Sequence, residues 1–210
     1  GGIRFGLFGL QGNNAVAVSP MIKPATFADP VVIAQAMVAK LREEGAEVVI
    51  LLSHMGVVQQ ADGSWRGEEV ELVEQVPGID IVVGGHSHTA LAQPLLVNGR
   101  TPVMQAGSEI QHLGELRMRL PADGKPQVVD YQLHPINDQI TGSVAISAQV
   151  EDFKQVVNAQ MLAPKGYTFD QPLAKVDKTL TRAYDDPILG NLVTDALRHA
   201  TGSDVSFTGN

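Results

Sequence analysis

The chain has 210 residues, of which 44% are hydrophobic and none is cysteine, and its formal net charge is −8. This length is enough for one large core or two small ones, and the lack of cysteine excludes disulfides and thiolate metal sites. The negative charge argues against general binding to nucleic acid or anionic membranes. No run approaches the ~20 apolar residues of a membrane span.

The first part of the chain alternates between strand and helix signals. Asp29 and Pro30 are typical of a helix N-cap and first turn, and Gly45 is typical of the end of that helix. This alternation predicts an α/β fold with a parallel sheet. Strands are expected over 3–10, 47–52 and 79–83, and helices over 31–41 and 68–76.

The middle of the chain changes to hairpin signals. Asn98-Gly99 is a strong turn pair between two short apolar runs, 95–97 and 101–104. A second alternating pair, 116–120 and 129–133, flanks the turn 122–125. We expect these hairpins to form an antiparallel flank on the second sheet of a two-layer β-sheet core flanked by helices.

The last part returns to helical periodicity. A helix is expected from Ser147 to Met161, a strand-like segment over 173–180, and a further helix that begins at Asp186-Pro187 and ends at Gly202.

Histidines follow two of the expected buried strands. His54 follows the strand 47–52, and His86 and His88 follow Gly84-Gly85 after the strand 79–83. Ligands of open parallel sheets bind outside the carboxyl ends of the strands, and neutral imidazole is a common ligand of zinc and related metals. The three histidines are therefore candidate metal ligands. A His-x-His motif alone is weak, and a solvated polar loop is the alternative for it.

Other polar residues are expected to be structural. Glu68, Glu69, Glu71 and Glu74 are interpreted as a solvated helix face rather than metal ligands. His112 and His134 lie on the hairpins, where no second ligand signature is nearby, and are interpreted as structural or surface residues.

Several motifs together resemble the metallophosphoesterase (calcineurin-like) superfamily, and within it the bacterial 5′-nucleotidase family. The resemblance covers nearly the whole chain in the family's order. It rests on Ser53-His54-x-Gly56, Gly-Gly-His-Ser-His-Thr at 84–89, Gln105-Ala106-Gly107, Leu113-Gly114 and Leu-Gly-Asn-Leu-Val-Thr-Asp-Ala at 189–196. For Asn191 and Asp195 in the last motif, helix packing is an equal alternative to ligand contact.

The resemblance implies a dinuclear site for two divalent metal ions, such as Zn or Mn. It assigns His54 and His86 to one ion and His88 to its neighbour. An extended backbone from His86 to His88 would also send the two rings to opposite sides. The family's Asp-x-His, bridging Asp and Asn-His motifs are absent from this sequence. The catalytic histidine and the remaining ligands are therefore expected upstream of Gly1, and no catalytic residue is assigned within the chain.

The resemblance further implies a metallophosphoesterase-like fold, incomplete at the N-terminus. Residues 1–146 would form the C-terminal half of the catalytic domain, 147–165 a linker helix and 166–210 the start of a substrate-binding domain. The implied function is a metal-dependent hydrolase of nucleotide catabolism that converts a nucleoside monophosphate to nucleoside and phosphate. Its implied location is the periplasm, the extracellular space or the cell surface. Hydrolysis of 2′,3′-cyclic nucleotides, nucleotide sugars or sulfur esters is the alternative, and a catalytically dead metal-binding or interaction module is another.

We predict that these 210 residues alone have no appreciable phosphatase activity, because open positions in a metal site do not replace absent ligands. The measurement is hydrolysis of a nucleoside monophosphate by the purified 210-residue chain with added manganese. Robust turnover that a chelator abolishes would contradict the prediction.

Overall fold

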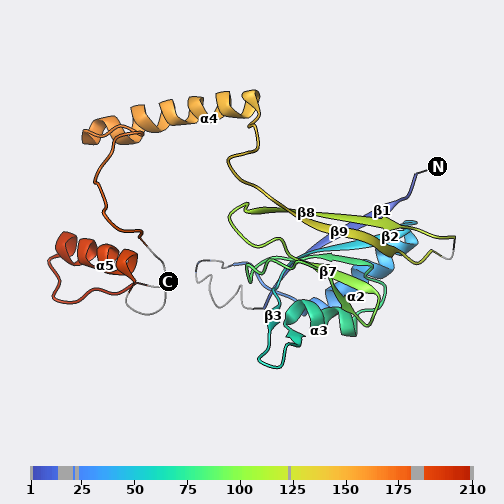
Figure 1. The fold of residues 1–210 in the computed structure, drawn as a ribbon. Coiled ribbons are helices and arrows are strands. Elements are labelled where there is room, and N and C mark those ends of the chain that lie inside the picture. Colours follow the sequence, from blue (N-terminus) through green and yellow to red (C-terminus); the bar gives the residue numbers. More distant parts are fainter. Residues whose placement is uncertain (1, 14–20, 22–23, 123, 181–186, 209–210) are drawn as a thin grey trace. The chain divides into compact units, whose positions relative to one another are not determined.

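The computed structural model describes residues 2–13, 21, 24–122, 124–180 and 187–208, and it divides into two compact units, Gly1–Thr141 and Gly142–Asn210. Figure 1 shows strands alternating with helices along the first unit. No described helix combines the length and the hydropathy that a membrane span requires. The elements of the first unit are β1 (Phe5–Gln11), α2 (Pro30–Glu43), β2 (Val48–His54), β3 (Val58–Gln59), β4 (Trp65–Arg66), α3 (Glu68–Gln75), β5 (Ile81–Val83), β6 (Leu95–Val97), β7 (Thr101–Met104), β8 (His112–Arg119) and β9 (Gln127–Pro135).

The central sheet has five strands in the order β1-β2-β5-β7-β6. β1, β2, β5 and β7 are parallel to one another, and β6 is antiparallel to β7. The α/β prediction is confirmed. The predicted turn is also present, because Asn98 and Gly99 have φ of 53° and 68°. Its hairpin differs from expectation in one respect: β7 pairs with β5, so the hairpin extends the first sheet rather than a second one.

Two helices cover one face of this sheet. α2 begins where predicted, because the Oδ1 atom of Asp29 accepts a hydrogen bond of 2.8 Å from the Val31 N–H, and Gly45 follows it with a φ of 88°. Figure 1 shows α2 and α3 on the side of the sheet opposite β8 and β9. The buried side chains of this layer include Ala34 and Val38 of α2, Val49 and Leu51 of β2, Leu72 and Val73 of α3, Val82 of β5 and Val103 of β7.

The hairpin of β8 and β9 packs on the other face, where Tyr131 belongs to one buried cluster with Val48, Ile81 and Met104. This arrangement of two β layers with helices outside confirms the predicted architecture. Between the layers lies a mainly apolar cavity of about 470 Å³. Burial raises the pKa of the Tyr131 phenol, whose oxygen has no partner among the described residues.

Part of the same sheet face is not covered by the described residues of the first unit. Leu7, Leu52 and Val83 are 55%, 47% and 45% exposed. Leu52 and Val83 lie near the carboxyl ends of β2 and β5, and Leu7 lies near the middle of the edge strand β1. Large apolar side chains are most often buried. The open part of the face therefore adjoins the edge from which the histidine loops leave.

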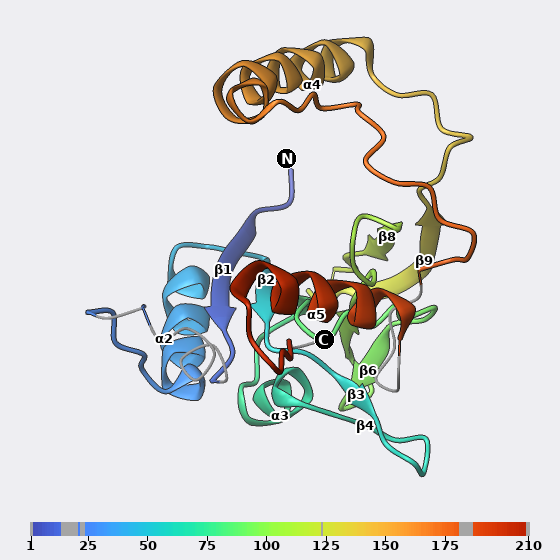
Figure 2. The ribbon, with the colours of Figure 1, turned by 90° about the vertical axis from the view of Figure 1, so that its left-hand side faces the viewer.

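The second unit contains α4 (Val144–Val157) and α5 (Ile188–Thr201), both visible in Figure 2. A π-helical segment, Asn158–Leu162, and a short 3₁₀ turn, Ala163–Lys165, prolong α4 up to Gly166, which has a φ of 81°. The predicted helices are confirmed. The prediction of a strand-like segment over 173–180 is wrong. The described residues of this unit contain no strand with which such a segment could pair.

Two predicted features involve residues outside the described ones, namely Asp123 in the turn 122–125 and Asp186 at the start of α5. The finer division of the chain at residues 146 and 165 stays a prediction.

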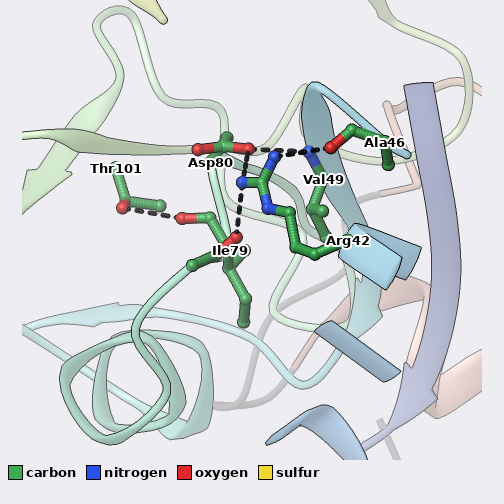
Figure 3. Close-up of polar contacts among 7 residues, drawn as sticks. Arg42, Ala46, Val49, Ile79, Asp80 and Thr101 are labelled. Atoms are coloured by element: carbon green, nitrogen blue, oxygen red, sulfur yellow. Dashed lines mark hydrogen bonds and ion pairs between the residues drawn. The ribbon is translucent and has the colours of Figure 1, made fainter. Parts of the chain in front are cut away.

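An ion pair ties α2 to the amino ends of β2 and β5 (Figure 3). The guanidinium of Arg42 contacts the Asp80 carboxylate and donates to the carbonyl oxygens of Ala46 and Gly78 at 3.0 and 3.1 Å. The same Oδ2 atom of Asp80 accepts from the Val49 N–H at 2.7 Å. The Asp80 side chain is 16% exposed, so water screens this pair only in part.

Replacing Arg42 by Met should lower the free energy of unfolding by about 1–3 kcal/mol, because the Asp80 carboxylate keeps its partly buried position and loses its cation. Trp65, the only tryptophan, packs against the core, so its fluorescence in a urea titration measures the effect. Lys40→Met is the control, since Lys40 is exposed on the same helix. Equal shifts in the two variants would contradict a special role for the Arg42–Asp80 pair.

Candidate metal centre

His54 is the last residue of β2. Side chains alternate along a strand, so His54 leaves on the same face as Ile50 and Leu52, and it is exposed. Its carbonyl oxygen accepts a hydrogen bond of 3.1 Å from the Gly12 N–H, just beyond β1. The ring borders an open groove of about 480 Å³, which is lined by Gly9, Leu10, Gln11, Leu52, Ser53, His54 and Val83.

The loop 84–89 follows β5, the strand that pairs with β2. The Gly84 N–H donates to the Met104 carbonyl oxygen at 2.7 Å and so prolongs the contact between β5 and β7. Beyond it, His86 and His88 have φ of 74° and 56°. The expectation of an extended backbone at these two residues is therefore wrong, and strand alternation does not determine where their rings point. Left-handed backbone costs about 1–3 kcal/mol at a residue other than glycine and is often found at functional sites.

The structure brings His54 and His86 together. Their ring centroids lie 5.0 Å apart, and the ring planes meet at 69°. A Cβ atom on Gly85 would lie 3.2 Å from Nδ1 of His54, so a side chain at this position would crowd the ring. Two exposed imidazoles at this separation suit a divalent transition metal as part of its ligand set.

His88 is exposed in the same loop. Among the described residues, no group of three or more His, Asp or Glu side chains is close enough to hold a metal ion. Of the three candidate ligands, the described part of the chain therefore brings two, His54 and His86, into contact. The assignment of His88 to a second ion stays a prediction.

The acidic residues of α3 do not all face solvent. Glu71 and Glu74 are exposed, as predicted. The prediction is wrong for Glu69, which has no exposed surface. It is also incomplete for half-buried Glu68, whose Oε2 atom accepts a hydrogen bond of 3.0 Å from the Asn13 N–H.

The sequence contains a signal for the burial of Glu69. It lies three and four residues before Leu72 and Val73, which are buried in the core. Positions i, i+3 and i+4 share one face of a helix. Glu69 therefore belongs to the apolar face of α3, and its charge alone does not indicate exposure.

The Glu69 carboxylate accepts three hydrogen bonds beneath the histidine loops. Its Oε1 atom accepts from the backbone N–H groups of Gly56 and Gly85 at 3.2 and 3.3 Å. Its Oε2 atom accepts from Nε2 of Gln105 at 3.0 Å. Gly56 is two residues after His54 and Gly85 is one residue before His86, so one oxygen atom connects both loops.

Gln105 extends these contacts to His88. It is 2% exposed, and its Oε1 atom accepts from the Ser87 hydroxyl at 2.9 Å and from the Thr89 N–H at 3.4 Å. Ser87 and Thr89 flank His88, and both are bonded to the backbone of Val57 at 3.1 Å. The residues next to the three histidines in sequence are thus joined by one polar network.

Known proteins resemble this chain in sequence and in fold. Residues 15–90, which include all three histidines, match the family model of the calcineurin-like phosphoesterases. Over these residues the chain is similar to this family. Calcineurin-like phosphoesterases depend on metal ions, and the donor chemistry of the His54–His86 pair fits a metal.

Individual relatives match more of the chain. The trifunctional nucleotide phosphoesterase YfkN of Bacillus subtilis is 26% identical over 99% of this chain and 14% of its own length. A 2′,3′-cyclic-nucleotide 2′-phosphodiesterase/3′-nucleotidase of Salmonella typhimurium is 30% identical over 59% and 21%. The crystal structure of a 5′-nucleotidase precursor from Thermus thermophilus has a TM-score of 0.74 at 26% identity and covers 96% of this chain and 41% of that one. The chain therefore spans less than half the length of each of these relatives.

His112 and His134, the histidines of the hairpin of β8 and β9, do not join the pair. Nε2 of His134 lies 2.8 Å from the Glu115 carboxylate on β8. Hydrogen bonds from Arg117 and then His134 lower the pKa of the Glu115 carboxyl. His112 is half-buried on β8, and its Nδ1 atom has no partner among the described residues. These positions agree with a structural or surface role.

Gly84→Ala should lower the free energy of unfolding by about 1–3 kcal/mol, because its Cβ atom would lie 2.3 Å from Oε2 of the buried Glu69. Gly9→Ala is the matched control, since the nearest atom to its Cβ would be 3.7 Å away. Urea denaturation followed by Trp65 fluorescence measures both variants. If Gly84→Ala unfolded at the same urea concentration as Gly9→Ala, the close seating of Glu69 against this backbone would be wrong.

Proposed function

We propose that this chain supplies part of the dinuclear metal site of a phosphoester hydrolase whose substrate is a nucleoside monophosphate. The observation that carries the proposal is the His54–His86 pair, 5.0 Å apart where β2 and β5 end. The similarity of residues 15–90 to the calcineurin-like phosphoesterases supports the reaction class. Because the chain spans only part of its relatives, the activity is proposed for the full-length protein.

In this proposal the chain's own residues hold and orient the metal ligands. His54 and His86 bind one ion and His88 binds the other. When bound, two divalent ions supply Lewis acidity and lower the pKa of an attacking water. The net charge of −8 opposes the approach of a phosphate at long range, so local cationic charge at the histidine edge has to draw the substrate in.

The substrate class rests on the relatives. A 5′-nucleotidase precursor from Thermus thermophilus shares the fold over 96% of the chain, which supports a nucleoside monophosphate. The Salmonella relative is named for 2′,3′-cyclic nucleotides, and this name supports cyclic nucleotides as the second candidate substrate. We further propose that the protein works outside the cytoplasm, since the Thermus relative is named a precursor.

In the full-length protein, His88→Ala should reduce the bound metal from two ions to about one, while His54 and His86 retain the other. His86→Ala should weaken the ion that His54 shares. Elemental analysis of each purified variant, combined with hydrolysis of a nucleoside monophosphate and of a 2′,3′-cyclic nucleotide, measures these effects. Chelation should abolish hydrolysis, and added manganese or zinc should restore it.

The control is His199→Ala, because this histidine is exposed on α5, and its metal content should stay unchanged. A wild-type protein that binds no divalent metal would contradict the proposed function. Equal loss of both ions in the His86 and His88 variants would contradict the division of ligands, and calorimetric titration would then show whether the two sites are coupled.

A further inference from the structure

Glu69 and Gln105 are the two buried polar side chains whose contacts surround the histidines. Glu69 has no exposed surface and Gln105 is 2% exposed. Their hydrogen bonds reach Gly56, Gly85, Ser87 and Thr89, and each of these residues lies within two positions of His54, His86 or His88. A buried polar pair with this pattern can fix a loop conformation as well as stabilise the fold.

The geometry shows that Glu69 is not itself free to bind a metal. Both of its carboxylate oxygens accept hydrogen bonds from N–H groups, and it makes no ion pair with a described residue. A carboxylate that accepts several N–H groups is well satisfied without a cation. Any effect of Glu69 on metal binding therefore acts through the loops of His54 and His86, to which it is hydrogen-bonded.

These loops need a restraint. His86 and His88 both have left-handed φ, which persists only where the surroundings determine it. The Gly85 N–H bond to Glu69 precedes His86, and the bonds of Ser87 and Thr89 to Gln105 flank His88. The pair thus restrains the backbone on either side of both strained residues.

We propose that Glu69 and Gln105 are positioning residues that set the spacing of the two histidine loops and thereby the metal affinity of the site. This inference rests on the proposed function, because it concerns the ligands of that metal site. It assigns the effect to a pattern of donors and acceptors rather than to a negative charge at residue 69.

The pattern can be exchanged between the two positions. In the double variant Glu69→Gln/Gln105→Glu, the amide oxygen of residue 69 accepts from Gly56 and Gly85, and its NH₂ group donates to residue 105. The new carboxylate at 105 accepts from Ser87 and Thr89. The buried charge then has three N–H or O–H donors, as it has in the wild-type protein, and the net charge is unchanged.

Neither single variant preserves the pattern. With Glu69→Gln, an N–H group of residue 69 faces either the N–H groups of Gly56 and Gly85 or the NH₂ group of Gln105. If Gln105 turns over to avoid this, its NH₂ group faces the Thr89 N–H. With Gln105→Glu, two carboxylates face each other. An unmet buried donor or a like-charge contact displaces the loops.

The test is calorimetric titration of the metal-free, full-length protein with Mn²⁺ and with Zn²⁺. Each single variant should bind about 10–100-fold more weakly than wild type, as expected for groups that orient metal ligands. The double variant should recover to within about 10-fold of wild type on the same scale. Glu71→Gln, exposed on the same helix, is the control and should bind as wild type does.

Two further measurements separate positioning from stability. Urea denaturation followed by Trp65 fluorescence establishes the conditions in which each variant is folded, and the titrations are performed there. A merely structural role would lower the unfolding midpoint and leave the affinity of the folded protein unchanged. Amide hydrogen exchange at Gly56 and Gly85 should be faster in Glu69→Gln and slow again in the double variant.

The outcomes are distinct. Wild-type affinity in Glu69→Gln, or a double variant no better than the weaker single one, would overturn the inference. If the wild-type protein binds neither metal, the proposed function fails, and the exchange rates at Gly56 and Gly85 still decide whether the pair holds the loops. If a single variant does not fold, a folded double variant supports the exchange and an unfolded one overturns it.

Discussion

The parallel pairing of β2 with β5 is the constraint on which the candidate site depends. In register, Ile50, Leu51 and Leu52 lie beside Ile81, Val82 and Val83. Both strands therefore end at the same edge, and the residues that follow them become neighbours although about thirty positions separate them in sequence. The central apolar side chains of this pairing are fully buried, so a shift of register would remove large side chains from the core. The cost of such a shift fixes the place at which His54 and His86 meet.

The two edges of the sheet are built differently. At the amino edge, the Arg42–Asp80 ion pair and the bond from the Thr101 hydroxyl to the Ile79 carbonyl oxygen, 3.0 Å long, join a helix to three strands (Figure 3). At the carboxyl edge, two of the three candidate ligands, His86 and His88, are in left-handed conformation. Backbone strain at a candidate ligand site requires a rigid support. The contacts of the Arg42–Asp80 pair at the amino edge and the hydrogen bonds of buried Glu69 and Gln105 provide that support.

The local elements could be predicted from the sequence because their signals act over short distances. Asp29-Pro30 fixes the start of α2, Asn98-Gly99 fixes a turn that needs positive φ, and the apolar runs before His54 and His86 identify buried strands. The family motifs identified the three candidate ligands. The segment 173–180 shows the limit of such signals, since a strand requires a partner that propensity alone does not supply.

Only the tertiary structure decided the conformation of the histidine loop and the role of Glu69. Left-handed backbone at His86 and His88 is unfavourable locally, so no local rule predicts it. In the tertiary structure, the residues on either side of both histidines are hydrogen-bonded to Glu69 or Gln105. The sequence contained the helical spacing that buries Glu69, but its three partners come from β7's end and from two separate loops. Charged side chains are normally exposed. Glu69 can be buried because three N–H groups from distant parts of the chain donate to its carboxylate. Sequence thus determined which side chains are available, and the packing of distant segments determined which of them act together.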